Sequence, residues 1–230
     1  MSEHSGLLAT KRGEANAFVV IGAGPGLGAA AARRFGREGH PVGLITRNTE
    51  RLAAMATDLN SEGITTATAA ADVTDAQALT AALDALRTRL GPIQAALFSP
   101  RPSLSWIKPV LDTGPSDIAN ALALNVVAAA AAVRAVLPDM LDQRNSTLLF
   151  TTGGAAVEPH RDRAVSAIAY AAESAYVRML HDALVDQGVY AAQVTVVGPI
   201  GPGARHEPDE VAQHLWRLHI ERDQPLLVLR

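Results

Sequence analysis

Four glycines at alternate positions dominate one short turn near the start of the chain, Gly22-Ala23-Gly24-Pro25-Gly26-Leu27-Gly28. The turn follows an apolar run and precedes a stretch with helical spacing of apolar residues, a context in which such a turn indicates a nucleotide site. Glycine lets the backbone approach a pyrophosphate closely, and the following helix directs its free N–H groups at that anion. The turn therefore predicts a dinucleotide site, with NAD(P), a flavin or another nucleotide as candidate ligands. The alternative is a tight turn that binds nothing.

The residues after the second apolar run, Thr46-Arg47-Asn48, bear on the choice of cofactor. Proteins that bind NAD place an acidic residue at this point, where it holds the ribose hydroxyls. This chain has no acid there, and the guanidinium of Arg47 can pair with the 2′-phosphate of NADP. We therefore predict NADP as the cofactor. The alternative is an arginine that is only solvated.

These residues need a scaffold that brings strand ends together. Seven short apolar runs alternate with helical patterns, at 18–21, 42–45, 65–71, 93–98, 147–151, 193–197 and 226–229. Strands separated by single helices pair in parallel through right-handed crossovers, and runs that are apolar throughout are typical of strands covered on both faces. The sequence predicts an α/β fold, a doubly wound, seven-stranded, mostly parallel Rossmann sheet in a three-layer α/β/α arrangement.

Helices are expected between these runs, over 27–38, 52–59, 74–90, 116–137 and 164–187 and from Pro208 onward. Thr74 and Gln77 have the spacing of a capping box at the start of the third helix. The helix over 116–137 contains five successive alanines and is apolar on every face, which requires burial beyond one sheet. It therefore predicts a homodimer or homotetramer, although alanine is also simply a good helix former.

Composition excludes several classes of function. The chain has no cysteine, which excludes disulfides and thiolate chemistry, and its net charge of −3 gives no basic surface for nucleic acid. Its seven histidines lack ligand spacing, so no metal is expected. We expect residues 1–16 to be a flexible tail without the apolar core of a signal peptide, and 17–230 to form a single dinucleotide-binding domain. No uninterrupted apolar run reaches the length of a membrane span, so we expect a cytoplasmic protein without membrane contact.

Several motifs, in order and spacing, resemble the short-chain dehydrogenase/reductase family along nearly the whole chain. Gly22, Gly26 and Gly28 match the family's glycine motif, and Asp72-Val73 matches the pair that contacts adenine after the third strand. The stretch Val194-Thr195-Val196-Val197-Gly198-Pro199 is similar to the strand and proline beside the nicotinamide. The resemblance implies further cofactor contacts from Ser99, Pro199 and Ile200.

The resemblance also implies a catalytic set of asparagine, serine, tyrosine and lysine. In the family, the tyrosine is the general acid or base, the lysine lowers its pKa and holds the ribose, and the serine binds the substrate oxygen. The matching residues are Asn125, Thr152, Tyr170 and Ser174. Thr152 keeps the hydroxyl, but Ser174 replaces the lysine, and no lysine follows Lys108. Each of these residues also has a structural reading, as a packing, capping or backbone-bridging group.

Three further departures affect the expected site. The family's Asn-Asn-Ala-Gly is replaced by Phe98-Ser99-Pro100-Arg101. The segment between Thr152 and Tyr170 is longer than usual, and arginines 161 and 163 in it, or Arg101, are candidates to replace the missing cation. Residues 200–207 alone connect the sixth strand to the last helix, where the family builds its substrate lid.

Three functions remain open. The leading hypothesis is an NADP(H)-dependent oxidoreductase that reduces a carbonyl or imine of a small organic molecule. The second is a degenerate family member that binds NADP(H) as a sensor or structural partner. The third is an enzyme that uses the site for non-redox acid–base chemistry. The residues Tyr170, Thr152 and Asn125 favour the first hypothesis, whereas the missing lysine and short lid favour the others.

Overall fold

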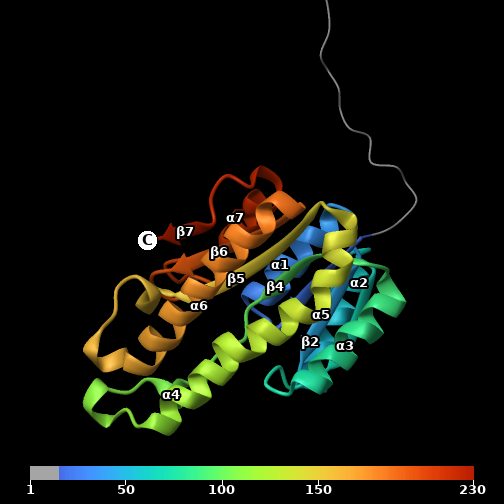
Figure 1. The fold of residues 1–230 in the computed structure, drawn as a ribbon. Coiled ribbons are helices and arrows are strands. Elements are labelled where there is room, and N and C mark those ends of the chain that lie inside the picture. Colours follow the sequence, from blue (N-terminus) through green and yellow to red (C-terminus); the bar gives the residue numbers. More distant parts are fainter. Residues whose placement is uncertain (1–15) are drawn as a thin grey trace, which may run out of the picture.

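Seven parallel strands form one sheet in the order β3-β2-β1-β4-β5-β6-β7 (Figure 1). The computed structural model describes residues 16–230, apart from the side chain of Ser105, so nearly all of the tail predicted for 1–16 lies outside the described residues. The strands are β1 Ala17–Ile21, β2 Val42–Thr46, β3 Thr66–Ala70, β4 Ile93–Phe98, β5 Ser146–Gly153, β6 Val189–Val196 and β7 Leu226–Leu229. All six pairings are parallel, which confirms the predicted doubly wound α/β fold.

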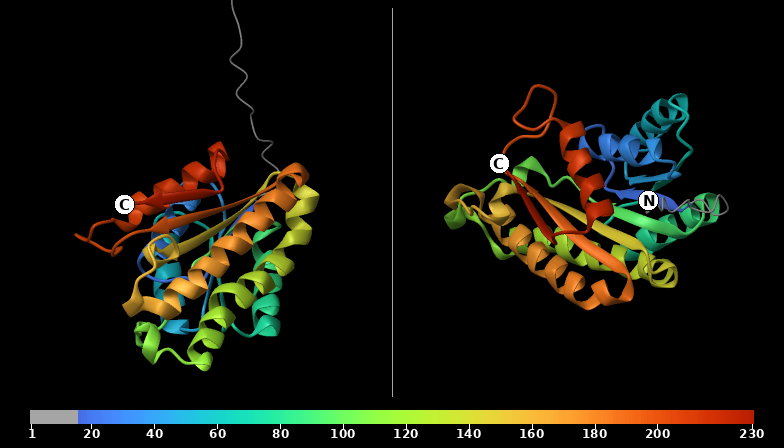
Figure 2. Two further views of the ribbon diagram at one scale, coloured as in Figure 1. Left: turned by 60° about the vertical axis from the view of Figure 1, so that its left-hand side comes forward. Right: turned by 90° about the horizontal axis from the view of Figure 1, so that it is seen from above.

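Helices cover both faces of the sheet (Figure 2). One face carries α1 Leu27–Arg37, α2 Thr49–Ser61 and α7 Pro208–Glu221. The other carries α3 Ala76–Leu90, α5 Ala128–Gln143 and α6 Ala164–Leu184. Residues of β1 alternate between the two cores, because successive side chains of a strand point to opposite faces. Val19 and Ile21 pack on the α3–α5 side, whereas Phe18 and Val20 pack on the α1–α7 side.

The start of α3 differs from the prediction. Asp75, rather than Thr74, is the N-cap, and its carboxylate accepts the backbone N–H groups of Gln77 and Ala78, each at 3.0 Å. The hydroxyl of Thr74 instead donates to the carboxylate of Asp72 at 2.7 Å. A capping box was wrongly predicted because an aspartate one residue later is an equally good cap.

The long helix predicted for 116–137 is longer and is interrupted. It consists of α4 Pro115–Leu122, a π-helical turn at Ala123–Val127 and α5, which continues to Gln143. Pro138 does not end it, although proline removes a donor and normally breaks a helix. The carbonyl that loses this donor belongs to Arg134, an exposed residue, so water can satisfy it.

The same stretch, Pro115–Gln143, is long and apolar enough to cross a membrane by length and composition, with 39% of its most apolar window buried in the structure. Its small residues serve a different purpose here. Ala128, Ala129 and Ala132 are almost completely buried against the sheet, with Val133 and Val136 beside them. The apolar composition therefore reflects close packing of α5 on β1, β4 and β5.

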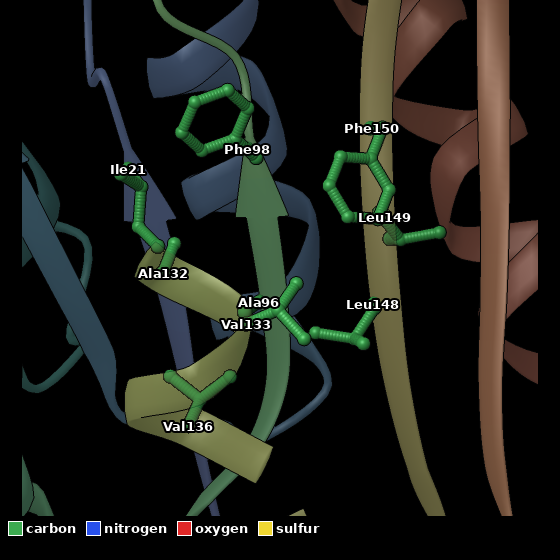
Figure 3. A pocket seen from close by; sticks show the side chains of 9 residues that line it. All are labelled: Ile21, Ala96, Phe98, Ala132, Val133, Val136, Leu148, Leu149 and Phe150. Carbon is green, nitrogen blue, oxygen red and sulfur yellow. The ribbon is translucent and has the colours of Figure 1, made fainter. Parts of the chain in front are cut away.

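A small apolar cavity of about 10 Å³ lies in this interface (Figure 3). Side chains from β1, β4, β5 and α5 surround it, including those of Ile21, Phe98, Val133 and Phe150. A cavity of this size is about one water in volume, and an apolar lining offers such a water no partners. It is a packing gap in the core and too small for a substrate.

A cluster of aromatic and imidazole rings joins α1 to α7. The rings of Phe35, His40 and Trp216 each lie within 5.3–5.7 Å of the His219 ring, centroid to centroid. The Nδ1 atom of His219 lies 2.9 Å from the hydroxyl of Thr147. Burial, and then the charges of nearby His40 and Arg222, lower the pKa of His219 to about 3. His219 is therefore neutral in the folded protein.

Because His219 is neutral in the folded protein, we predict that the stability of the fold decreases in acid. The unfolded chain takes up a proton on His219 below its ordinary pKa of about 6.5, and the folded chain does not until about pH 3. The free energy of unfolding should therefore be highest above pH 6.5 and fall on acidification, by up to about 1.4 kcal/mol per pH unit from this residue. Urea titrations between pH 7.5 and 5 measure this loss. His219→Gln keeps a partner for Thr147 but does not titrate, and an equal acid loss in both proteins would refute the assignment.

Candidate functional site

The predicted nucleotide residues meet at the carboxyl ends of β1, β2 and β4. The strand order reverses between β1 and β4, which is where open α/β sheets bind ligands. The helix α1 begins directly after Gly26, with no side chain capping it and no acidic residue in its first turn. No neighbouring atom lies within 4 Å of a Cβ built on Gly24 or Gly26. A helix N-terminus that is uncapped beside open space fits the pyrophosphate of a dinucleotide.

The first glycine of the turn has a separate, structural reason. Gly22 has a φ of +85°, and a Cβ built on it would lie 2.5 Å from the Cα of Pro100. The turn therefore packs directly against the segment that replaces the family's Asn-Asn-Ala-Gly. Next to it, Ser99 donates its N–H to the carbonyl of Ile21 at 2.9 Å, and its hydroxyl accepts from Thr151 at 2.6 Å.

The two residues predicted to contact the adenosine half lie together. Arg47 Nη1 is 3.3 Å from Asp72 Oδ2, and the Arg47 side chain is 77% exposed. An exposed pair of this kind contributes at most about 1 kcal/mol, so Arg47 is available to an anionic ligand. Hydrogen bonds from Thr74, followed by the charge of Arg47, hold the pKa of Asp72 below its usual range. Val73, the other residue of the pair, is buried in the core.

The predicted catalytic residues Thr152 of β5 and Tyr170 of α6 lie near the same end of β5. The Tyr170 ring lies against Gly153, where a Cβ would be 3.2 Å from Cε2. Gly153 directly follows Thr152, so the phenol and the threonine belong to one end of β5. Any larger residue at 153 would displace the ring. Burial, and then the carboxylate of Glu173, raise the pKa of Tyr170 to about 12.

A buried hydrogen-bond cluster occupies the region of the missing lysine. Gln193 Nε2 lies 2.7 Å from Thr152 Oγ1, 2.8 Å from Thr195 Oγ1 and 2.9 Å from Ser174 Oγ. Thr152 Oγ1 and Thr195 Oγ1 are 3.0 Å apart. The hydroxyl of Ser174 donates to the carbonyl of Tyr170 at 2.8 Å. Ser174 is thus tied to the helix and to Gln193, and contributes no positive charge.

Asn125 is 3% exposed and lies within the π-helical turn, where its amide donates to the carbonyl of Ala121 at 2.9 Å. This turn and α4 pack against α6, the helix of Tyr170. The π-helical turn has one more residue per turn than an α-helix would, and such turns are frequent at functional sites. This bond corresponds to the backbone-bridging role, and Asn125 makes no hydrogen bond to Tyr170 or Thr152.

The short connection after β6 folds onto itself beside Pro199 and Ile200. The imidazole of His206 lies 3.1 Å from the carbonyl of Val197, and its backbone N–H donates to Pro199 at 3.3 Å. Ile200 and His206 also form an isolated bridge. This loop is closed by its own hydrogen bonds and does not extend over the site as a long lid.

The inserted segment between β5 and α6 packs on the segment after β4. The backbone N–H of Ala164 donates to the carbonyl of Lys108 at 3.2 Å, and residues 161–163 lie next to 110–112. Both segments leave the same edge of the sheet and lie side by side in both views (Figures 1 and 2). Arg161 is 85% exposed and pairs loosely with Asp162 at 3.8 Å, so it remains in solvent as the structure stands.

Sequence reasoning missed Gln193, Thr195 and Glu173. Gln193 is the one amide in the strand Val189–Val196, and a polar residue in an apolar run is the signal that could have identified it. Glu173 is 1% exposed, and its Oε1 has no hydrogen-bond partner among the described residues. Burial raises the pKa of this carboxyl well above its ordinary value.

The fold is that of an α/β dinucleotide-binding protein, with several hydroxyl groups at the end of β5. A family model described as short chain dehydrogenase matches residues 16–206, and the chain belongs to this family. It is an oxidoreductase of the short-chain dehydrogenase type, and the family uses NAD(P).

Individual relatives are distant. An uncharacterized oxidoreductase from Staphylococcus epidermidis is 28% identical over 181 residues, 79% of this chain and 75% of that protein. A short chain dehydrogenase from Pseudocercospora fijiensis is 25% identical over 169 residues, 72% of this chain but 52% of that longer protein. The NADPH-bound structure of a short chain oxidoreductase from Pseudomonas aeruginosa PAO1, which contains an atypical catalytic center, has a TM-score of 0.86 at 19% identity. It covers 94% of this chain and 95% of its own.

The contact between Gly22 and Pro100 gives a stability prediction. Gly22→Ala must place a side chain at positive φ and against a backbone atom, whereas Gly39→Ala, at φ +96°, meets nothing within 4 Å. Gly39→Ala should lose about 1–2 kcal/mol from the backbone conformation alone. Gly22→Ala should lose about 1–3 kcal/mol more from the steric overlap. Urea unfolding of both variants measures the difference, and equal losses would show that the turn can move away from Pro100.

Proposed function

We propose that the protein is an NADP(H)-dependent reductase of a carbonyl or imine in a small organic molecule. The observation that carries this proposal is the contact of the Tyr170 ring with Gly153, the residue after Thr152, at the end of β5 and at the edge where the glycine turn lies. The proposal takes residues 17–230 as one dinucleotide-binding domain and the protein as cytoplasmic. The packing of the apolar helix α5 on the sheet supports a location away from membranes.

The residues present fit a dinucleotide. The open space at Gly24 and Gly26 and the uncapped α1 would receive the pyrophosphate. Arg47, next to the N-terminus of α2, would hold a 2′-phosphate, with Asp72-Val73 near the adenine. Ser99, Pro199 and Ile200 would line the nicotinamide half. The bound cofactor would supply the hydride. NADPH is also the ligand of the similar Pseudomonas structure, which supports this choice of cofactor.

The protonation of Tyr170 favours reduction. A phenol with a pKa of about 12 is ionised in about one molecule in 100,000 at pH 7. Reduction needs Tyr170 as an acid, and the neutral phenol is the dominant form. Oxidation needs the tyrosinate, which burial and Glu173 disfavour and no lysine at position 174 stabilises. The site is therefore suited to one direction of the reaction.

A second candidate function is cofactor binding without hydride transfer. The replacement of the lysine by Ser174, whose hydroxyl is tied to the Tyr170 carbonyl, favours it. Non-redox acid–base chemistry by Tyr170 is the third candidate and shares that support. Turnover assays separate these functions from the reductase.

Cofactor preference follows from Arg47. NADPH should bind about tenfold more tightly than NADH, because one charge-assisted bond at an exposed site supplies about 1.5 kcal/mol. Arg47→Ala should remove this difference and leave the affinity for NADH unchanged. Calorimetric titration of both cofactors against both proteins measures the effect. Equal affinities of the wild type for NADH and NADPH would contradict the assignment of Arg47.

Catalysis should depend on the phenol of Tyr170. Tyr170→Phe should lower the rate of NADPH-dependent reduction at least about 100-fold while the cofactor still binds. The matched control is Tyr176→Phe, on the same helix, which should keep the rate. The wild-type rate should not fall as the pH is raised to 10, because the acid stays protonated up to about pH 12. A panel of aldehydes, ketones and imines serves as substrates, and an unchanged rate in Tyr170→Phe would make this residue a packing group.

Oligomerisation should bury the outer faces of the long helices. Val127, Ile168 and Met179, on the helical segments at 123–127 and 164–184, are 61%, 40% and 63% exposed, and burial against a second copy would remove their apolar surface from water. We expect a homodimer or homotetramer, as is typical of the family. Light scattering at micromolar concentration measures the mass, and a monomer of 24.0 kDa alone would contradict the expectation.

A further inference from the structure

The buried cluster around Gln193 contains enough fixed donors and acceptors to determine where each proton lies. Gln193, Thr152 and Thr195 are 1%, 5% and 0% exposed, so water cannot exchange freely with their polar atoms. Buried polar hydrogens are almost always hydrogen-bonded, and each hydroxyl has only one to donate. The direction of every bond can therefore be worked out from the helix inward.

Ser174 sets the first direction. Its hydroxyl donates its single proton to the carbonyl of Tyr170, 2.8 Å away on the same helix. Toward Gln193 it can present only lone pairs, so the amide atom 2.9 Å from Ser174 Oγ must be a donor. That atom is Nε2, and the orientation of the amide is fixed. With the amide reversed, two oxygens without a proton between them would face each other.

The orientation of the Gln193 amide then determines the direction of the hydrogen bonds of Thr152 and Thr195. Nε2 carries two protons: one is directed at Ser174, and the other is shared between Thr152 Oγ1 and Thr195 Oγ1, at 2.7 and 2.8 Å. The hydroxyl of Thr195 is completely buried and must also donate its proton. Gln193 Nε2 offers it no lone pair, and the acceptor the structure provides for Thr195 is Thr152 Oγ1, at 3.0 Å. Thr195 therefore donates to Thr152.

We infer that Gln193 and Thr195 are positioning residues that hold Thr152 as a double acceptor, so that its own proton is directed at the substrate oxygen. Both lone pairs of Thr152 Oγ1 face the cluster, and its proton has no protein acceptor there. The ligand group that matches this free donor is an acceptor such as a carbonyl oxygen. The inference rests on the proposed function and narrows its substrate class toward carbonyl compounds.

The arrangement also explains why serine is suited to position 174. A residue there without a hydroxyl would leave the amide of Gln193 free to reverse and to accept from Thr152. Gln193 Oε1 is buried and has no partner among the described residues, which shows that the cluster is not built to satisfy every atom of the amide. In this orientation of the amide, Nε2 and the hydroxyls of Ser174 and Thr195 all have partners, and Thr152 is left free to donate.

Neutron diffraction from crystals exchanged into D₂O tests the inference without any assay. The expected map places deuterium from Ser174 on the line to the Tyr170 carbonyl, and from Thr195 on the line to Thr152 Oγ1. Deuterium on both Gln193 positions that face Ser174 and the threonines completes the pattern. Deuterium of Thr152 directed at Thr195 or at Gln193 would overturn the inference.

Kinetics test its consequence. Gln193→Glu replaces the donor by an acceptor of the same shape, and Thr195→Val removes one donor to Thr152. Both should lower kcat about tenfold or more, with NADPH affinity unchanged, because a misdirected Thr152 donor is lost mainly in the transition state. Thr195→Ser should restore kcat to within about twofold of the wild type, which a purely packing role would not require.

The control is Thr147→Val, which removes another fully buried hydroxyl from β5 beside His219 and should keep kcat. If Gln193→Glu does not fold, the comparison of Thr195→Val with Thr195→Ser still decides the matter. Equal kcat in wild type and Thr195→Val would overturn the inference. Absence of any turnover in the wild type would instead refute the proposed function, and the neutron map would still decide the proton directions.

Discussion

The burial of a parallel sheet on both faces is the constraint on which the rest of the structure depends. Neighbouring parallel strands need a long crossover, usually a helix, and each strand from β1 to β6 is followed by helical structure before the next strand. The crossovers bring all carboxyl ends to one edge. That edge is where glycine, serine and threonine replace the aliphatic residues of the strands, and where the nucleotide turn meets the residues of β4 and β5.

The loss of a lysine changes how this edge is organised. A lysine at position 174 would bring a charge and a long chain into the space between α6 and β5. Ser174 instead leaves room for the amide of Gln193, which connects α6, β5 and β6 through hydrogen bonds of 2.7–2.9 Å. Compared with a site that has lysine at position 174, this site has a neutral, hydrogen-bonded cluster in place of a positive charge. Tyr170 is consequently left with burial and Glu173 as the dominant influences on its pKa, and both favour the phenol.

The fold was predictable from the sequence because its signals are local. The spacing of apolar residues, the length of each apolar run and the glycines that follow the runs were enough to identify all seven strands along the chain. Details that depend on competition between neighbours were not predictable. Thr74 and Asp75 are both acceptable caps, and only the backbone at position 75 decides between them. The helix predicted to end at Leu137 continues through Pro138, because the carbonyl that loses its donor is one turn earlier on the exposed Arg134.

The site was predictable where residues act alone and not where they act across elements. The glycine turn, Tyr170 and Thr152 follow from motif and position. Gln193 could not be given a role, because its partners come from a strand and a helix that lie 19 to 41 positions away in sequence. The pairing of Arg47 with Asp72, 25 positions apart, was hidden for the same reason.

A crystal structure of the protein with NADPH would show whether Tyr170 and Thr152 form the reaction centre of an NADP(H)-dependent reductase. We expect the pyrophosphate at the N-terminus of α1, the 2′-phosphate against Arg47, and the reactive carbon of the nicotinamide facing the Tyr170 hydroxyl and Thr152 Oγ1. A nicotinamide turned away from these two groups, with the rest of the cofactor in place, would contradict this expectation.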